Sequence, residues 1–239
     1  MQKLQLNHDD AVTELKRLVG SLVTRPGRKL LGLAGGPGVG KSTLALDLVV
    51  ALNEQRPGFS AYVPMDGFHM RHDKLVAIGI ERQKGMPHTF EAAQFVEFIR
   101  RLKAAEGEAI HVPGYSREIE DVVDGAIVVD AATQLVVVEG NYLLLEYSPW
   151  SELRALIDLA VFMDVPRSTV EQRLLRRHAE AGLFTSEHIR AHVEAVDLHN
   201  YDLVKHFGSD AAESGATRTA IPAQGGQQSG DCGQQVMAA

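Results

Sequence analysis

The sequence predicts an α/β fold: a three-layer sandwich in which a mostly parallel sheet carries helices on both faces. Two observations predict this fold. Short apolar runs recur along the chain without strict alternation of apolar and polar residues, and segments with helical spacing separate them. Strands that are apolar throughout are typical of a parallel sheet buried on both faces. With 239 residues, of which 45% are hydrophobic, the chain is long enough to bury one substantial core.

The elements follow from the spacing of apolar residues and from their caps. Expected strands cover 30–34, 59–65, 135–138 and 159–163; expected helices lie within the first 25 residues and at 42–53, 89–105, 168–181 and 186–206. Asn7 and its neighbours supply a capping cluster for the first helix. We expect Thr89 to cap the helix that follows it.

The chain divides into three expected parts. Residues 1–28 form an N-terminal helix packed on the core, and residues 29–207 form the main domain. Residues 208–239 have no aromatic residue and are rich in Gly, Gln, Ser and Ala. Such a segment cannot bury enough surface to offset its ordering entropy, so we expect a disordered tail.

Composition excludes several classes of protein. A formal charge of −7 gives no global attraction to nucleic acid or to anionic lipid, so neither is an expected partner. The single cysteine, Cys232, excludes a disulfide-stapled fold. No apolar run is long enough for a membrane helix, and the N-terminus lacks the apolar centre of a signal peptide. We therefore expect a cytoplasmic enzyme; its oligomeric state stays open, and a homodimer is compatible with the sequence.

A glycine-rich loop between the first expected strand and helix of the main domain carries the chemistry. It matches G-x-x-x-x-G-K-[ST] in full, and the nucleotide-binding residues expected from it are Gly35, Gly36, Pro37, Gly38, Val39, Gly40, Lys41, Ser42 and Thr43. Glycines let successive backbone N–H groups turn toward a phosphate, and the helix N-terminus adds to the field. Lys41 would reach the β and γ phosphates, and the Ser42 hydroxyl would hold Mg²⁺. The loop indicates a P-loop NTPase-type fold that binds ATP with Mg²⁺.

Acidic residues follow three of the other expected strands. Asp66, Glu139 and Asp164 each stand where a strand ends, and the carboxyl ends of parallel strands share one edge where ligands bind. Carboxylates beside a triphosphate suggest metal binding and activation of an acceptor hydroxyl. Alternatively, Asp66 with Gly67 is a simple turn, and Asp164 caps the next helix. The chain lacks the N-K-x-D element of a GTPase and the L-S-G-G-Q element of a transporter ATPase.

Several further motifs resemble the phosphoribulokinase, uridine kinase and pantothenate kinase family. They are Pro64-Met65-Asp66-Gly67-Phe68-His69, Lys84-Gly85-Met86-Pro87-His88-Thr89-Phe90-Glu91, Val112-Pro113-Gly114-Tyr115-Ser116-Arg117, Val138-Glu139-Gly140-Asn141-Tyr142 and Arg173-Leu174-Leu175-Arg176-Arg177. Together with the loop they span about Leu30 to Asn200, and they are specific to the family rather than to one substrate. The resemblance implies a kinase that phosphorylates a hydroxyl of a small molecule, with a small helical lid at about 170–200.

The resemblance also implies roles for individual residues. Asp66 matches the carboxylate that orients and deprotonates the acceptor, Glu139 the acidic group on Mg²⁺, and Arg173 a lid arginine that contacts the transferring phosphate. Arg177 joins the nucleotide-binding set, and residues expected to face the acceptor are Phe68, His69, His88, Tyr115, Arg117 and Asn141. For the arginines, a solvated helix face paired with Glu171 or Glu180 is the alternative.

The acceptor is suggested by the residues after Tyr115. Arginine and acids stand there, in Arg117-Glu118-Ile119-Glu120-Asp121, where nucleoside and pantothenate kinases of this family carry a histidine or aromatic cluster. This lining suits a polyhydroxylated acceptor, and the pattern is similar to a bacterial subgroup described as fructose-transport-linked or fructokinase-like kinases. We therefore expect a sugar as the acceptor, with a nucleoside or pantothenate as the alternative acceptor. The alternative of another class is a non-catalytic NTP-binding regulatory module.

The ten histidines raise the question of a metal centre. His188 and His192 stand four apart on an expected helix, but no H-E-x-x-H or Cys/His spacing accompanies them. We do not expect a zinc site from this pair.

Overall fold

The computed structural model describes residues 2–105, 107–182, 185–210 and 218–220. Six strands form one sheet; in spatial order they are β1 (Gln2–Lys3), β8 (Arg218–Ala220), β7 (Leu159–Met163), β2 (Lys29–Gly35), β6 (Leu135–Gly140) and β3 (Ser60–Pro64). Every pairing within this sheet is parallel. The four strands expected from the sequence form four neighbouring positions of it.

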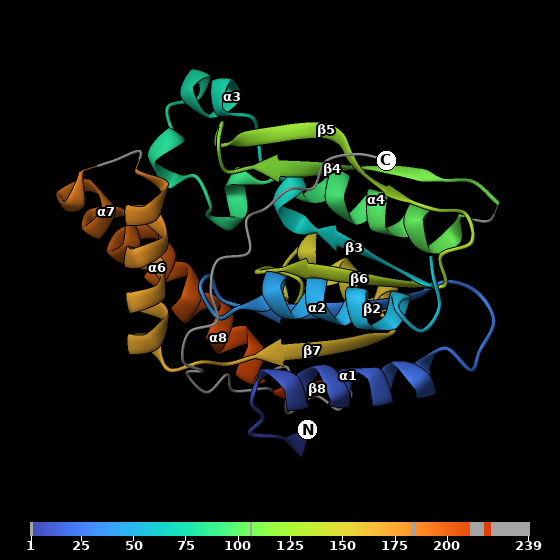
Figure 1. Cartoon of the computed structure of the whole chain (residues 1–239). Coiled ribbons are helices and arrows are strands. Elements are labelled where there is room, and N and C mark those ends of the chain that lie inside the picture. The colour runs from blue at the N-terminus through green and yellow to red at the C-terminus, as the bar shows by residue number, and fades with distance from the viewer. Residues whose placement is uncertain (1, 106, 183–184, 211–217, 221–239) are drawn as a thin grey trace.

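Helices cover the sheet on both faces, and the alternation of side chains along each strand decides which core each residue joins. Leu31 and Leu33 pack in the core under α1 (His8–Leu22) and α2 (Lys41–Asn53). Leu30, one position earlier, packs with the opposite core under α4 (Ala92–Ala104) and α5 (Leu153–Leu156). The predicted three-layer α/β sandwich is therefore confirmed (Figure 1).

The remaining helices lie mainly at the carboxyl ends of the strands. They are α3 (His72–Ala77), α6 (Arg167–Ala181), α7 (Ser186–His192), the π-helix η5 (Val193–Leu198), α8 (His199–Asp210) and the 3-10 turns η1 (Met65–Phe68), η2 (Glu81–Gln83), η3 (Pro87–Thr89) and η4 (Trp150–Glu152). The arrows of β3, β6 and β7 point to the side on which α6 and α7 lie (Figure 1). Residues that follow these strands therefore meet α6. No helix within the described residues is long and apolar enough to cross a membrane.

A second, two-stranded sheet was not expected from the sequence. β4 (Ile110–Ser116) and β5 (Asp121–Val129) pair in antiparallel fashion, with a shift of register near Gly114. The hairpin packs against η1, the turn that carries Asp66. Buried residues recur at every second position over 110–114 of β4, whereas residues 123–126 of β5 are all exposed. Neither strand is therefore an apolar run of the kind that predicted the parallel sheet.

Two expectations about local structure were wrong. Thr89 lies inside η3 and bonds Met86 and Gly85, while Glu91 precedes α4 as its N-cap. Asp164 does not cap α6; its carboxylate accepts a hydrogen bond from Tyr201 and pairs with Lys205 of α8. A tight turn takes the hydrogen bonds of Thr89, and partners distant in the sequence take those of Asp164. Neither side chain is therefore free to cap a helix.

Part of the segment 208–239, which was expected to be a disordered tail, forms secondary structure. Residues 208–210 complete α8, and Arg218–Ala220 add a strand beside β7; the rest of 208–239 lies outside the described residues. The prediction considered only side-chain burial. An open strand edge also offers backbone donors and acceptors, which any composition can pair with.

Candidate active site

The glycine-rich loop connects β2 to α2 and wraps the N-terminus of that helix. Gly40, the N-cap residue of α2, has φ +100°, a conformation that residues with a side chain rarely adopt. The first turn of α2 therefore starts with its backbone N–H groups free of a side-chain cap, as an anion site requires. Thr43, expected in the nucleotide set, lies exposed in that first turn.

Lys41 is the buried cation of the site. Its ammonium donates to the Gly36 carbonyl at 2.9 Å and to Asn141 Oδ1 at 2.7 Å. Glu139 Oε1 lies 3.5 Å from it, and both side chains are 6% exposed. Burial lowers the pKa of Lys41 and raises that of Glu139, and the attraction between the two opposes both shifts. A bound polyphosphate would add further negative charge beside this ammonium and favour its charged form.

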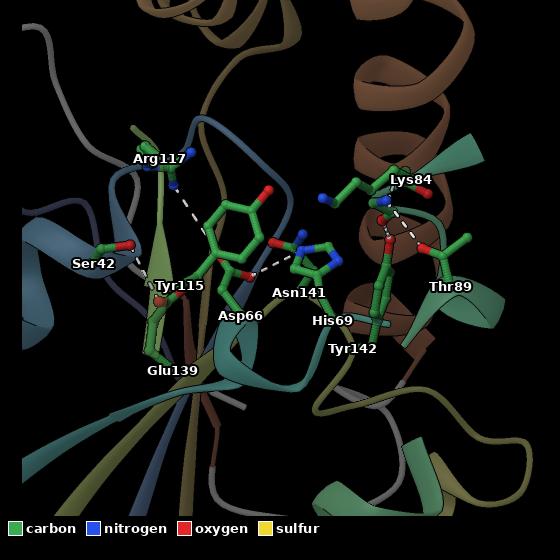
Figure 2. A network of polar contacts seen from close by, with 12 residues as sticks. Ser42, Asp66, His69, Lys84, Thr89, Tyr115, Arg117, Glu139, Asn141 and Tyr142 are labelled. Carbon is green, nitrogen blue, oxygen red and sulfur yellow. Dashed lines mark hydrogen bonds and ion pairs between the residues drawn. The ribbon is translucent and has the colours of Figure 1, made fainter. Parts of the chain in front are cut away.

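Two hydroxyl groups donate to the other oxygen of the Glu139 carboxylate. Ser42 Oγ lies 3.1 Å from Oε2 and Tyr62 Oη lies 3.0 Å from it. Ser42 and Glu139 come from α2 and from the end of β6, and Figure 2 shows them facing each other. This is a set of oxygen donors with one carboxylate, and it fits Mg²⁺.

Asp66 stands in η1, just after β3, and its carboxylate is partly open with a side-chain exposure of 34%. Arg117 Nη2 lies 3.8 Å from Oδ2, and His69 Nε2 lies 4.0 Å from Oδ1 (Figure 2). No hydrogen bond to this carboxylate occurs among the described residues. Asp66 is therefore held near two basic groups while its oxygens stay available to a ligand.

His69 lies beneath the Asp66 carboxylate between aromatic rings. Its ring centroid is 3.9 Å from that of Phe90 and 5.0 Å from that of Tyr115. Burial lowers the pKa of His69 to about 4, although Asp66 opposes the shift. Nδ1 is buried and has no hydrogen-bond partner in the described part of the chain. At neutral pH the ring is therefore uncharged.

The β4–β5 hairpin also borders the site, and its residue Tyr115 packs against the ring of His69. The Tyr115 hydroxyl donates to Glu120 Oε2 at 2.9 Å. Lys84 donates to the Glu120 carbonyl, and its ammonium lies 5.4 Å from the centroid of the Tyr115 ring. Burial and the negative charge of Glu120 raise the pKa of Tyr115, so the phenol stays protonated and acts as a donor.

The arginines of α6 divide into two groups. Arg173 donates to the carbonyls of Gly38 and Val39 at 3.4 and 3.3 Å, which places it on the glycine-rich loop. Burial lowers the pKa of Arg177, and the nearby Arg117 lowers it further. Arg176 instead pairs with Glu180 at 3.6 Å on the exposed face of the helix, as the solvated-face alternative predicted for it.

Three residues expected to face the acceptor have other surroundings. Phe68 was predicted wrongly: it is 8% exposed and packs on Phe95 and Phe98, because η1 turns it into the core and turns its neighbour toward the site. His88 is exposed and bonds Gln83 at 2.6 Å. Asn141 contacts Lys41 rather than the Asp66 side of the site.

Three residues of this site were not singled out from the sequence. Tyr62 was in no motif, Lys84 stood only within a family motif, and Glu120 only within the stretch after Tyr115 that was expected to suit a polyhydroxylated acceptor. A tyrosine in a strand that is otherwise buried needs a partner for its hydroxyl, and that was an available signal for Tyr62. Glu120 has φ +50°, which the sequence does not reveal because the turn of the hairpin imposes it.

The fold and these residues define a P-loop small-molecule kinase. The profile of the Phosphoribulokinase / Uridine kinase family matches residues 30–207. The chain belongs to this family, whose members transfer phosphate to hydroxyl acceptors.

Individual relatives carry different substrate names. A candidate uridine kinase of Schizosaccharomyces pombe is 34% identical over 179 residues, which cover 73% of this chain and 76% of the relative. A solved structure of a candidate fructose transport system kinase from Silicibacter sp. TM1040 is 31% identical with a TM-score of 0.75, covering 87% of this chain and 98% of that one. The pantothenate kinase of Limosilactobacillus reuteri is 29% identical, and the match covers 62% of this chain and 48% of the relative's length.

Proposed function

We propose that this kinase transfers the γ-phosphoryl group of ATP to a hydroxyl of a small polyhydroxylated metabolite, with a fructose-like sugar as the favoured acceptor. One observation carries the proposal. The partly open Asp66 carboxylate follows β3, while Lys41, Ser42 and Glu139 gather beside the adjacent end of β6. A candidate base thus stands next to the expected place of a triphosphate.

The nucleotide side of the proposal uses the glycine-rich loop. Backbone N–H groups of the loop and Lys41 would bind the phosphates of ATP. Ser42 and Glu139 would hold Mg²⁺, which neutralises phosphate charge when bound. Arg173, which already donates hydrogen bonds to the loop, would stabilise negative charge on the transferring phosphoryl group. Arg177 of the same helix would belong to the nucleotide-binding set.

On the acceptor side, Asp66 orients the hydroxyl and takes its proton late in the transfer. The hydroxyl oxygen forms the new bond to the γ-phosphorus, and the bond from that phosphorus to the bridging oxygen of ADP breaks. Arg117, 3.8 Å from Asp66, places a positive charge beside this base. His69 Nε2, which lies 4.0 Å from Asp66, would contact the acceptor from a ring that is neutral at pH 7.

We propose that the helical segment at about 170–200 acts as the lid of this site. Arg173 contacts the loop from α6, so movement of the segment would open or cover the phosphates. A closed lid would exclude water and limit wasteful hydrolysis of ATP.

The polar lining of the acceptor side supports a sugar. Tyr115, Glu120, Lys84 and Arg117 offer both donors and acceptors of hydrogen bonds. Hydroxyl groups of a sugar can pair with both kinds. A nucleoside or pantothenate is the alternative, because relatives with those names match this chain.

The test measures ADP release from Mg·ATP against a panel of sugars, nucleosides and pantothenate. We expect a fructose-like sugar to raise turnover, and Asp66→Asn to lower kcat by roughly 100-fold or more while ATP binding persists. Asp124→Asn is the matched control, because Asp124 is an exposed hairpin carboxylate paired with Arg71.

The outcomes separate the alternatives. A nucleoside or pantothenate that raises turnover alone would overturn the sugar assignment but keep the role of Asp66. A basal rate that no acceptor changes, with Asp66→Asn equal to the unmodified chain, would favour a regulatory NTP-binding module and overturn the proposal.

A further inference from the structure

A second polar cluster lies among the helices after the P-loop domain's last strand. It consists of His178 on α6, His192 at the end of α7 and Asp197 in η5. One ligating atom from each residue lies within 4.8 Å of the other two. His178 Nε2 is 2.8 Å from Asp197 Oδ2, and the two imidazole rings meet edge to face with centroids 5.4 Å apart.

The π-helix brings two of these residues to one side of the chain. His192 and Asp197 are five residues apart, and in an α-helix they would point about 140° away from each other. The wider winding of η5, which bonds residues five apart, reduces that divergence. Single π turns inside α-helices are frequent at functional sites, and this one aligns two side chains that could act as ligands.

We propose that His178, His192 and Asp197 bind one zinc ion. Two imidazole nitrogens and one carboxylate oxygen form a donor set that zinc accepts, with a fourth position left for water. Mg²⁺ and Ca²⁺ prefer all-oxygen sites, so the two histidines favour a transition metal. Zinc bonds of about 2.0–2.2 Å place the ligands of a tetrahedral site about 3.4 Å apart. His178 Nε2 and Asp197 Oδ2, now 2.8 Å apart, would separate slightly, and any pair of ligating atoms near the 4.8 Å limit would move closer.

The position of the cluster gives the ion a structural role. His178 follows Arg177 on α6, and η5 continues into α8, whose Asn200 donates to the Gly85 carbonyl at 3.0 Å. A zinc ion would therefore tie the arginine-bearing helix to the segment that contacts the Lys84–Gly85 loop. Figure 1 shows α6 and α7 together at the carboxyl end of the sheet. The sequence spacing of His188 and His192 concealed this site, because the partners of His192 lie on other elements.

The experiment titrates zinc by calorimetry into the full, untagged chain after removal of metals with a chelator, and repeats the titration with cobalt as a spectroscopic probe. Variants are His178→Ala, His192→Ala and Asp197→Asn, the last of which keeps the shape of the side chain. His188→Ala, on the same helix as His192, is the matched control. Circular dichroism and ATP binding check that each variant folds.

We expect one zinc per chain with a Kd in about the micromolar range or tighter. Each of the three ligand variants should weaken binding by at least about 100-fold, since loss of outer-shell partners alone costs 10–100-fold, and His188→Ala should not. Zinc should also raise the Tm of the unmodified chain and not that of His192→Ala. Absence of stoichiometric binding, or folded His178→Ala and His192→Ala chains that bind zinc as tightly as the unmodified chain, would overturn the proposal.

Discussion

The environment of Glu139 shows how much one buried carboxylate depends on its neighbours. One oxygen faces the Lys41 ammonium, and the other accepts the hydroxyls of Ser42 and Tyr62. Lys41 and Ser42 belong to the loop motif, and Tyr62 does not. Tyr62 reaches Glu139 from the adjacent strand, so it acts as a positioning residue for the expected metal ligand.

We predict that Tyr62→Phe raises the Mg²⁺ concentration needed for half-maximal activity by about 10-fold, because outer-shell partners tune metal ligands by 10–100-fold. Tyr147→Phe, at a tyrosine that is 43% exposed, should leave the Mg²⁺ requirement unchanged. The check is a Mg²⁺ titration of activity at saturating ATP. An unaltered requirement in Tyr62→Phe would contradict a positioning role.

His69 gives a prediction for stability against pH. Burial depresses its pKa from 6.5 to about 4, so the unfolded chain binds the proton more readily than the folded one. The stability that the neutral His69 ring contributes is complete above about pH 6.5 and is lost as the pH falls through 4. The free energy of unfolding then falls by up to about 3 kcal/mol. His69→Phe removes the titrating group and keeps an aromatic ring against Phe90.

We therefore expect the unfolding free energy of His69→Phe to fall less steeply between pH 7 and 4 than that of the unmodified chain. Denaturant unfolding at several pH values measures it. His88→Phe, at an exposed histidine, should keep the original slope. Parallel slopes for the unmodified chain and His69→Phe would refute the assignment.

At the scale of elements, Arg28 joins three segments just before β2. Its guanidinium donates to the carbonyls of Thr133 and Leu102 at 3.1 and 2.9 Å and to that of Asp130 at 3.1 Å. These carbonyls belong to the end of α4 and to the connection between β5 and β6. One side chain, 8% exposed, thus satisfies backbone acceptors that no helix or strand bonds use.

We predict that Arg28→Ala lowers the free energy of unfolding by about 3 kcal/mol, because it removes the guanidinium donor from the buried carbonyls of Thr133 and Leu102. Arg25→Ala, at an exposed position three residues earlier, should change it by less than about 0.5 kcal/mol. Urea unfolding compares the two. A similar small effect for both variants would show that water replaces the guanidinium.

At the scale of the whole molecule, the glycine-rich loop is packed directly against α8. A Cβ at Gly36 would lie 2.8 Å from the Tyr201 ring and 3.0 Å from its Cα. This contact joins the start of the nucleotide loop to a helix near the other end of the domain. A side chain at Gly36 would therefore push the loop and α8 apart.

We predict opposite effects for two glycine-to-alanine changes. Gly36→Ala should lower both the Tm and the affinity for ATP, because α8 and the loop must separate. Gly20→Ala, at an exposed helical position with no heavy atom within 4 Å, should stabilise the chain by about 0.5–1 kcal/mol. Thermal unfolding with and without Mg·ATP tests both. A Gly36→Ala chain as stable as the original would contradict the close packing.

Local patterns were enough to predict the four central strands and most of the helices. A short apolar run bounded by turn residues predicts a buried strand, and the spacing from Gly35 to Ser42 predicts a loop that binds phosphate. The positions of Asp66 and Glu139 at strand ends followed from the same reasoning, because parallel strands share an edge.

Only the tertiary structure decided which side chains meet. Tyr62 contacts Glu139 across 77 residues, and Phe68 turns inward while His69 turns to the site. His192 finds Asp197 and His178, not His188, because a π turn and a neighbouring helix bring them together. Such contacts are set by packing between elements, and a pattern along one chain records only the spacing within each element.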